Sequence, residues 1–387
     1  MTASVQHDIV IVGGGPVGGA LALALAPTAL SVLLLEARSE QARDDDPRTL
    51  ALSYGSRLIL ERLDVWNDVT PATPITSIHV SHRGAFGRTV LTAEEAGQSA
   101  LGYVVSHPTV QRALSAGLER ARHITRWYGV RATRLDADAE TVRIEVDEQG
   151  EHHDLRARLA VIADGGITAQ ALTQVDVREY AQSAVVASVH TSKPHGNRAF
   201  ERFTPEGPLA LLPRESNYAL IWSMAPDAAQ QLCVAPPDAF LAQLQAAFGE
   251  RAGRFIDVTA RASFPLSLRV ARAPRAARTV LLGNAAQTLH PVAGQGLNLG
   301  LRDAWELGEC LQSCAGDPGA KALLAAYASR RARDRATGIL LTDALVRVFS
   351  NEHIPLRVLR GCGLTFLDNL LPVKRAFAQQ MMFGRPY

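Results

Sequence analysis

The sequence predicts an α/β fold in which an antiparallel sheet is inserted into a domain built on a parallel sheet. Two short apolar runs near the N-terminus, residues 8–12 and 31–36, read as strands buried on both faces. The segment 16–26 between them is rich in Ala and Leu, which is typical of a tightly packed helix. This β-α-β order predicts the parallel sheet. Alternation with period two over 183–191 and 209–224, with Pro213 and Asn217 marking a turn, predicts the antiparallel sheet.

Later segments return to the first pattern. Residues 279–282 form another buried apolar run, followed by a glycine and by a helix predicted over 297–311. From Lys321 onward the pattern is helical, until Pro355 and Pro372 are expected to break it. The parallel-sheet domain is therefore expected to return at the C-terminal side of the insertion.

The composition is that of an ordinary globular protein and excludes several classes. The 387 residues include 40 Lys and Arg against 38 Asp and Glu, so the formal net charge is only +2. Hydrophobic residues make up 47% and charged residues 20%, which excludes a disordered chain, a collagen-like rod and a nucleic-acid binder that relies on bulk charge. We therefore expect no nucleic-acid partner. The length allows two domains, or one large domain with an insertion.

Cysteine usage and the N-terminus predict a cytoplasmic protein. Four cysteines without a CxxC pair are too few for a disulfide scaffold and are interpreted as reduced thiols. The N-terminal apolar run leads directly into glycines, without a basic segment or a cleavage site, which is typical of a buried strand and not of a signal peptide. No apolar stretch approaches the roughly 20 residues that cross a bilayer, so we expect at most peripheral contact with the inner membrane.

A glycine-rich turn, GGGPVG, follows the first strand and precedes the first helix. Gly13 permits the tight turn, Gly15 lets a pyrophosphate approach the backbone, and Gly18 lets helix and strand pack closely. The helix N-terminus favours an anion. Glu36 ends the second strand, where its carboxylate can accept hydrogen bonds from the ribose hydroxyls of an adenosine. Because this carboxylate would repel a 2′-phosphate, the motif favours FAD or NAD over NADP.

Two later segments bear on the choice between these cofactors. Asp164 and Gly165 follow the apolar run LAVIA, so an acid and a glycine stand at a strand end, where an ordinary turn is the alternative. Residues 283–298, GNAAQTLHPVAGQGLN, give a strand end, a polar loop and a glycine-flanked Gln before a helix. Backbone N–H groups at such a helix start can stabilise the negative charge that builds up at the O2/N1 edge of a reduced flavin ring.

In this order the three motifs resemble those of the class A flavoprotein aromatic hydroxylases, the fold group of p-hydroxybenzoate hydroxylase. Those enzymes carry GxGxxG, a central DG and a distal GD…P…GQGxN, and the similarity runs over essentially the whole chain. Within the group the chain is most similar to the hydroxylases of ubiquinone biosynthesis, which share a segment like DPRTLAL at 46–52. The distal motif, and RAFERFT at 198–204 before GPLALLP, resemble in particular the members that act on a 2-polyprenyl-6-methoxyphenol.

The resemblance implies a Rossmann-like FAD-binding domain, α+β overall, with an inserted antiparallel-sheet substrate domain and C-terminal helices. The FAD-binding domain would be discontinuous, over 1–75, 100–180 and 270–345. The substrate domain would comprise 76–99 and 181–269, and 346–387 would form the C-terminal helical segment.

The resemblance also implies an activity. The protein would be an FAD-dependent monooxygenase that uses O2 to hydroxylate the ring of a polyprenylated methoxyphenol through a C4a-hydroperoxyflavin. NAD(P)H would visit the flavin transiently as electron donor, which fits the lack of a second Rossmann fingerprint in the sequence. Two other functions stay open: a sister hydroxylase acting at another ring position, and a flavoprotein reductase or assembly subunit that does not hydroxylate.

All three motifs contribute cofactor-binding residues in this interpretation. The ADP half of FAD would be held by Gly13, Gly15, Gly18 and Glu36. The ribityl and phosphate portion would be bound at the two strand ends by Asp164, Gly165 and Asn284. The isoalloxazine ring would be lined, beside the substrate, by Pro291, Gly294, Gln295, Gly296, Leu297 and Asn298. Arg48 would approach the pyrophosphate or the nicotinamide entry side.

The chain departs from the family pattern at two places. The usual distal motif opens Gly-Asp-Ala-Ala-His, whereas this chain has Asn284 at the Asp position and Gln287 at the His position, so the charge is missing. The common DGxxSxxR lacks its Ser and its Arg, since Thr168 and Ala171 stand there. No nicotinamide contact is therefore carried over to these two positions.

No catalytic base and no metal site can be predicted from the sequence. His152 and His153 are adjacent, so on a strand they point to opposite faces and cannot bind one metal. No nucleophile elbow or metalloprotease helix is present, so the chemistry must come from the cofactor. For His290, substrate contact and a structural hydrogen bond stay open as alternatives.

The C-terminal tail has two interpretations. Residues 366–383, FLDNLLPVKRAFAQQMMF, mix aromatic and Met residues with Lys374 and Arg375. They form either a helix that packs on the core or a surface that meets a membrane or other ubiquinone-biosynthesis proteins.

Overall fold

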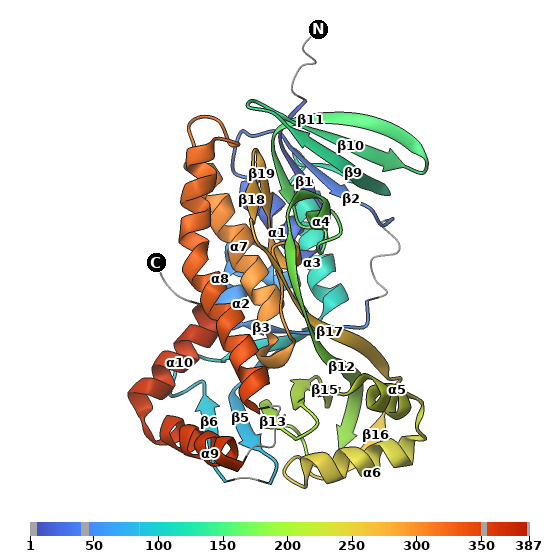
Figure 1. Cartoon of the computed structure of the whole chain (residues 1–387), viewed down its shortest axis with the longest axis vertical. Helices are drawn as coiled ribbons and strands as arrows, with labels where there is room; N and C mark the ends of the chain where they lie inside the picture. The colour runs from blue at the N-terminus through green and yellow to red at the C-terminus, as the bar shows by residue number, and fades with distance from the viewer. Residues whose placement is uncertain (1–5, 40–45, 85, 350–353, 385–387) are drawn as a thin grey trace.

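Three sheets and the helices packed on them make up the structure, a computed structural model that describes residues 6–39, 46–84, 86–349 and 354–384 (Figure 1). The first sheet has eight strands: β1 (His7–Val12), β2 (Val32–Glu36), β8 (Thr125–Tyr128), β9 (Val130–Ala137), β10 (Val142–Glu148), β11 (Glu151–Ile162), β18 (Arg275–Ala276) and β19 (Thr279–Leu281). Within it β19, β11, β1, β2 and β8 run parallel to one another, while β10 and β18 pair antiparallel with β11 and β19. The predicted parallel sheet is confirmed.

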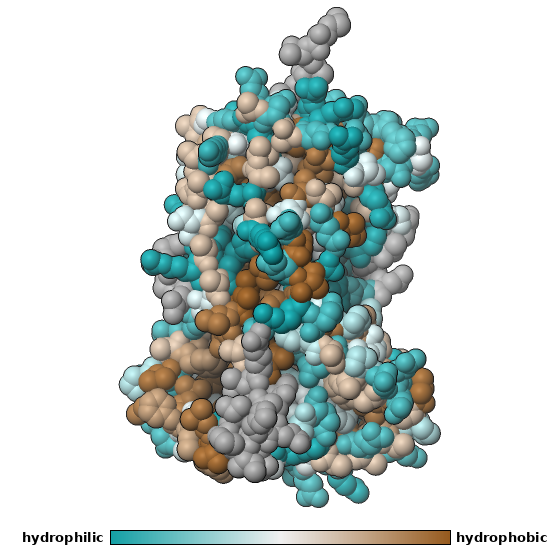
Figure 2. All heavy atoms as spheres, in the orientation of Figure 1, coloured by the Kyte–Doolittle hydropathy of each residue, from teal (hydrophilic) through white to brown (hydrophobic). Residues whose placement is uncertain are grey.

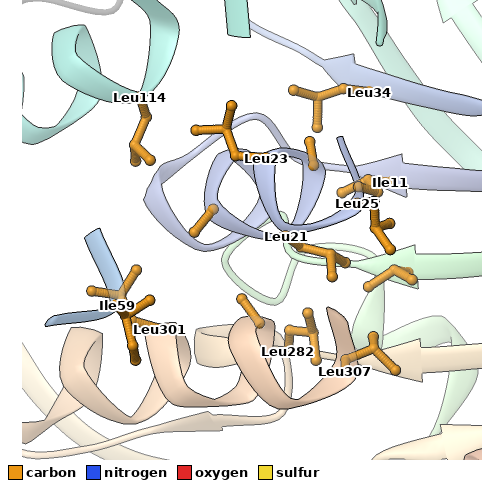
Figure 3. Packing of buried hydrophobic residues seen from close by; sticks show 14 of the residues in the cluster. Ile11, Leu21, Leu23, Leu25, Leu34, Ile59, Leu114, Leu282, Leu301 and Leu307 are labelled. Carbon is orange, nitrogen blue, oxygen red and sulfur yellow. The ribbon is translucent and has the colours of Figure 1, made fainter. Parts of the chain in front are cut away.

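Helix α1 (Pro16–Leu25) lies at the centre of the main core. Its residues from Gly18 to Leu25 are all buried, because it packs between the sheet and two further helices, α3 (His107–Arg120) and α7 (Gln295–Gln312). Figure 3 shows Leu114 of α3 and Leu307 of α7 approaching α1 from two sides. The core therefore fixes where α1 and α7 begin, and both predicted cofactor motifs lie at those helix starts.

The second sheet has nine strands and is mainly antiparallel, as predicted. It consists of β5 (Ser77–His82), β6 (Arg88–Thr92), β12 (Val175–Thr191), β13 (Arg198–Phe203), β14 (Pro208–Arg214), β15 (Asn217–Met224), β16 (Phe255–Val258), β17 (Ala262–Ala271) and β20 (Gln287–Thr288). One face is covered by α5 (Pro226–Val234) and α6 (Pro237–Phe248), whose apolar residues form a core with Phe200 and Trp222. Pro213, predicted to mark the turn, lies inside β14 instead, and the turn follows at Glu215 with φ +54.

β12 runs through the predicted domain boundary between 180 and 181, so the two predicted parts share one strand. A third, three-stranded sheet of β3 (Thr49–Ser53), β7 (Gly102–Ser106) and β4 (Thr73–Ile75) leads into helix α2 (Tyr54–Arg62). The short remaining elements are η2 (Trp66–Asp68), α4 (Ala169–Leu172), η3 (Gly283–Ala285) and η4 (Val292–Gly294).

The C-terminal helices are α8 (Lys321–Phe349), α9 (Ile354–Asn369) and α10 (Leu371–Phe383). Pro355 and Pro372 are each the second residue of a helix, so they begin α9 and α10 where they were predicted to break the helical pattern. Proline is tolerated there because the first turn of a helix has no partner for its N–H groups. Buried Arg331 of α8 pairs with Asp303 at 2.7 Å and Glu306 at 2.9 Å, which fastens α8 to α7.

Helices α9 and α10 have both a packed side and an exposed apolar side. Met382 and Lys374 are buried, and Lys374 Nζ pairs with Glu95 Oε1 at 3.0 Å. In contrast, the side chains of Phe366 and Val373 are 59% and 43% exposed. Figure 2 shows apolar residues gathered over these two helices. No helix among the described residues is both long and apolar enough to span a membrane.

Candidate active site

The glycine turn after β1 combines tight packing with one open position. Gly13 has φ +107, its N–H donates to the Leu35 carbonyl at 2.8 Å, and a Cβ there would lie 2.6 Å from the Ala163 backbone. A Cβ on Gly18 would lie 1.9 Å from the Gly13 carbonyl oxygen. A Cβ on Gly15, however, would meet no atom of the described residues within 4 Å. Two of these glycines are thus required by packing, and the third leaves space at the start of α1.

The start of α1 is built to receive an anion. The helix begins at Pro16, its first turn holds no acidic residue, and no side chain among the described residues caps it, so an anion is favoured there. Buried Glu36 accepts from the Gly14 N–H at 2.8 Å and from the Arg38 N–H at 3.0 Å. Gln111 of α3 donates to the Gly14 carbonyl at 3.1 Å. An uncapped helix start beside a fixed carboxylate fits the phosphates and ribose of an adenine dinucleotide.

The two predicted cofactor motifs meet at Val17. A Cβ on Gly300 of α7 would lie 2.7 Å from Val17 Cγ2, and a Cβ on Gly283 would lie 3.0 Å from the same atom. Segments far apart in the sequence are therefore in direct contact, and the starts of α1 and α7 lie next to each other.

The start of α7 is held by Asn298. Its Oδ1 accepts from the Ser53 N–H at 2.8 Å and from Ser56 Oγ at 2.7 Å, while its Nδ2 donates to the carbonyls of Ala51 at 2.9 Å and Gly294 at 2.7 Å. Gly294 precedes the helix with φ +59, and no side chain caps α7. Asn298 thus positions the start of α7, and the positive end of the helix dipole there suits the electron-rich edge of a flavin.

The other residues of the distal loop surround this helix start. Pro291, Gly296 and Leu297 line a cavity, and a Cβ on Gly296 would meet no atom within 4 Å. Gln295 is buried and donates through Nε2 to the Met381 carbonyl of α10 at 3.4 Å.

Asp164 builds the turn that was the alternative interpretation of its motif. Its carboxylate accepts from the N–H groups of Gly166 at 2.9 Å and Thr168 at 2.7 Å. A Cβ on Gly166 would lie 3.2 Å from the Asn284 carbonyl, and a Cβ on Gly165 would meet no atom within 4 Å. The two strand ends are therefore adjacent, and Asn284 is exposed on the cavity wall.

Arg48 also lies on the cavity wall, where a carboxylate orients it. Its Nε donates to Asp46 Oδ1 at 2.8 Å, and His107 Nδ1 lies 3.6 Å from Asp46 Oδ2. Burial opposes ionisation of Asp46, but the hydrogen bonds from Arg48 prevail and lower the pKa of Asp46 to about 2. The Arg48 side chain is about half exposed, so it remains accessible to an anionic group.

A cavity of about 940 Å³ connects the start of α7 to the nine-stranded sheet and to the C-terminal helices. At the end next to the starts of α1 and α7, which we call the cofactor end after the predicted motifs there, it is lined by Pro16, Arg48, Asn284, Pro291, Gly294 and Gly296. The sheet contributes apolar side chains that include Val80, Val186, Ile221 and Phe264. The far side is lined by Leu364, Leu367, Phe377 and Met381 of α9 and α10. Such a cavity suits a large, mainly apolar ligand placed beside a cofactor.

His290, in the distal loop, makes the structural hydrogen bond left open by the sequence. Its Nδ1 accepts from the Val292 N–H at 3.1 Å, and its ring meets Tyr180 edge-on with 5.2 Å between centroids. Burial lowers the pKa of His290 to about 4, so the ring is neutral at pH 7. Because Nδ1 accepts, Nε2 carries the hydrogen. Nε2 finds no hydrogen-bond partner among the described residues, so it can still serve a ligand in the cavity.

Sequence reasoning missed several residues of this site. Gln111 gives no local signal, because its contact to Gly14 depends on how α3 packs. Asp303 accepts from Gln287 Nε2 at 2.9 Å and so supports the distal loop from within α7. Glu201 lies on the cavity wall inside the quoted segment RAFERFT, but was given no role. The segment RAFERF has no period-two alternation, so the sequence alone gives no signal that Glu201 points into a cavity.

Comparison with known proteins now identifies the chain. A family model described as FAD binding domain matches residues 6–340. The chain belongs to this family of FAD-dependent monooxygenases. It is 34% identical to ubiquinone hydroxylase UbiL of Rhodospirillum rubrum, over 97% of this chain and 89% of that protein. It is 33% identical to 3-demethoxyubiquinol 3-hydroxylase of Escherichia coli, over 95% of this chain and 96% of that protein.

Among solved structures, p-nitrophenol 4-monooxygenase PnpA from Pseudomonas putida is similar over 100% of both chains, with a TM-score of 0.82 and 19% identity. The predicted fold class, the aromatic-hydroxylase resemblance and FAD as cofactor are thereby confirmed. The open space at Gly15 and the uncapped starts of α1 and α7 fit that cofactor. Among the described residues no group of three or more His, Cys, Asp or Glu side chains could hold a metal ion.

Proposed function

We propose that this monooxygenase hydroxylates the ring of a polyprenylated methoxyphenol in ubiquinone biosynthesis, with NAD(P)H as electron donor. The observation that carries the proposal is the apolar cavity of about 940 Å³ that runs from the start of α7 to α9 and α10. Its cofactor end suits an aromatic ring, and its apolar far side suits a prenyl chain. The names of the two relatives, a ubiquinone hydroxylase and a demethoxyubiquinol hydroxylase, support the same substrate class.

The protein's part in this reaction is to bind and orient. Bound FAD supplies the chemistry, namely uptake of two electrons and activation of O2 for insertion of one oxygen atom into the ring. The ADP half would be held by Gly13, Gly15, Gly18 and Glu36, and the ring portion by the loop before α7. Asp164, Gly165 and Asn284 would adjoin the ribityl and phosphate portion, with Arg48 near the pyrophosphate. Apolar walls exclude water from the reacting ring.

Isotope incorporation tests this function directly. The purified FAD-loaded enzyme would be given NADH or NADPH, ¹⁸O2 and 2-geranyl-6-methoxyphenol, a short-chain probe. We expect one ¹⁸O atom in the aromatic product and phenol-stimulated oxidation of one or both nicotinamides. NAD(P)H oxidation without labelled product would favour the reductase alternative, and neither activity would favour a flavin-binding assembly subunit.

The ring position has a second candidate. The similarity to a 3-demethoxyubiquinol 3-hydroxylase favours a sister activity at another position as the alternative. Mass spectrometry of lipid extracts from a strain lacking this gene distinguishes the two. Accumulation of the prenylated methoxyphenol one oxygen short of the quinol supports the proposed position, whereas accumulation of a demethoxyquinol supports the sister position.

The exposed apolar side of α9 and α10 supports peripheral contact with a membrane or with other ubiquinone-biosynthesis proteins. Substituting Phe366 and Val373 by Ser tests the membrane contact, because both side chains are exposed and neither lines the cavity. We expect the double variant to bind vesicles of phosphatidylethanolamine and phosphatidylglycerol less than the parent. Ile256→Ser, on β16 and 57% exposed, is the matched control and should bind as the parent does. Equal binding by all three proteins would end the membrane hypothesis.

A further inference from the structure

One row of residues crosses the cavity face of the nine-stranded sheet. Directly paired residues on neighbouring strands point to the same face. Glu201 of β13 is paired with Val80 of β5 on one side and with Ala210 of β14 on the other. The row continues through registered pairs in both directions, with Thr89 at one end and Ile221, Val186 and Ala262 at the other. All seven residues line the cavity, and Glu201 is the only charged one among them.

The Glu201 carboxyl has no counter-charge in this row. Its Oε1 is fully buried and has no hydrogen-bond partner among the described residues. The next residue, Arg202, points to the opposite face, where its Nε donates to the Ala247 carbonyl of α6 at 3.2 Å. Loss of hydration in this apolar setting raises the pKa of Glu201 to about 7. The carboxyl is therefore in a state from which it can take up or release a proton near neutral pH.

The other ionisable groups on the cavity wall are engaged elsewhere. Arg48 and His107 adjoin Asp46, Arg214 Nη1 donates to Thr49 Oγ1 at 3.2 Å, and the side chains of Arg360 and His82 lie 3.2 Å apart. His290 accepts from the Val292 N–H and is neutral. Within the described part of the chain, none of them forms an ion pair or hydrogen bond with Glu201.

Glu201 also lies close to the cofactor end. Phe203, two residues further along β13 on the same face, packs in one cluster with Val292 of the loop that precedes α7. Two residues of a strand span about 7 Å. Glu201 is thus two residues along β13 from the side chain that packs with that loop, and both Glu201 and Val292 line the same cavity.

We propose that Glu201 is a catalytic residue that accepts the hydroxyl proton of the phenol substrate. This inference rests on the proposed function, since it requires a phenol in the cavity. The phenol O–H bond breaks, its electron pair remains on the phenolate oxygen, and the proton binds a Glu201 carboxylate oxygen. The proton later leaves to water. The phenolate is the more electron-rich form of the ring and is therefore the better partner for an electrophilic oxygen.

The test combines three variants with two substrates. The FAD-loaded parent, Glu201→Gln, Glu201→Asp and the matched control Glu206→Gln would be given 2-geranyl-6-methoxyphenol, and ¹⁸O incorporation would be followed from pH 5.5 to 9. Glu206 is an exposed carboxylate paired with Arg83, and it does not line the cavity. Binding of the same phenol and of its methyl ether, which has no proton to give, would be measured on each oxidised enzyme.

We expect the parent rate to rise with pH through one ionisation near 7. Glu201→Gln should lower the rate about 100-fold or more and remove that ionisation, whereas Glu201→Asp should retain it. Glu201→Gln should also reduce the preference for phenol over ether about fivefold, with ether binding unchanged. The Glu206→Gln control should match the parent.

Two other outcomes overturn the inference in distinguishable ways. If the parent hydroxylates the phenol and Glu201→Gln keeps both the ionisation and the phenol preference, Glu201 is not the proton acceptor and the proposed function stands. If the parent neither binds nor hydroxylates the phenol, the proposed function fails and this inference fails with it.

Discussion

The two ends of the active-site cavity are built on different principles. At the cofactor end, the packing depends on glycines. A Cβ at Gly13, Gly18, Gly283 or Gly300 would lie within 3.0 Å of a neighbouring atom. At the other end, the sheet presents side chains of ordinary size on regular strands, and one carboxyl among them differs from its neighbours. The shape of the cofactor end is set by closely packed backbone segments, and the shape of the substrate end is set by the side chains on the sheet.

This difference predicts how each end responds to substitution. A Cβ at Gly13 or Gly18 would meet backbone atoms, so a substitution there must move the backbone, and we expect stability and cofactor binding to fall together. A change on the cavity wall leaves the backbone in place, so it alters charge and fit while the fold persists. Substitutions at each end of the cavity therefore test whether stability and substrate fit are separable.

Gly18→Ala should have the largest effect. Its Cβ would lie 1.9 Å from the Gly13 carbonyl oxygen, so α1 must move away from β1. We expect a loss of about 3 kcal/mol or more in the free energy of unfolding, together with loss of bound flavin. Urea denaturation and flavin absorbance per protein measure the two effects. Gly316→Ala, where a Cβ meets no atom within 4 Å, is the control and should change stability by less than about 0.5 kcal/mol.

Asn298→Ala should cost about 2–4 kcal/mol, because it removes two buried and two part-buried hydrogen bonds around the start of α7. Thermal and urea unfolding with saturating FAD would measure it. The matched control is Asn369→Ala, whose exposed amide donates only to the Thr365 carbonyl, and it should be nearly neutral. A nearly neutral Asn298→Ala would mean that the helix start does not depend on this side chain.

The same contrast explains what the sequence could predict. The β1–α1–β2 unit and the distal loop can be predicted because close packing of the backbone requires glycines at fixed spacing. That spacing is visible in a single sequence. Glu201 was not found, because its meaning depends on Val80 and Ala210, which are its neighbours only after the sheet forms. Pro355 and Pro372 were interpreted as breaks because the sequence alone does not distinguish the first turn of a new helix from the end of the previous one.

Glu201→Gln should stabilise the fold in a pH-dependent way. A carboxyl whose pKa rises from 4.5 to about 7 on folding lowers stability by up to about 3 kcal/mol above pH 7. This loss of stability disappears as pH falls from 7 to 4.5, because Glu201 is protonated in the folded state at a higher pH than in the unfolded state. Glu201→Gln should therefore exceed the parent in unfolding free energy at pH 8 and approach it near pH 5. A constant difference between these pH values would contradict a buried, uncompensated carboxyl.

Gly15→Ala should have the smallest effect on the fold and the most selective one on the cofactor. Gly15 has φ −67, which alanine adopts freely, and its Cβ would point into open space, so apoprotein stability should change by less than about 1 kcal/mol. If that space belongs to the pyrophosphate, the added methyl group should raise the Kd for FAD at least tenfold, which corresponds to about 1.4 kcal/mol. Fluorescence titration of apoprotein with FAD measures this, with Gly316→Ala again as control. Unchanged FAD affinity would mean that the cofactor does not occupy the open space beside Gly15. Parallel losses of stability and affinity would show that Gly15, like Gly18, is a packing position.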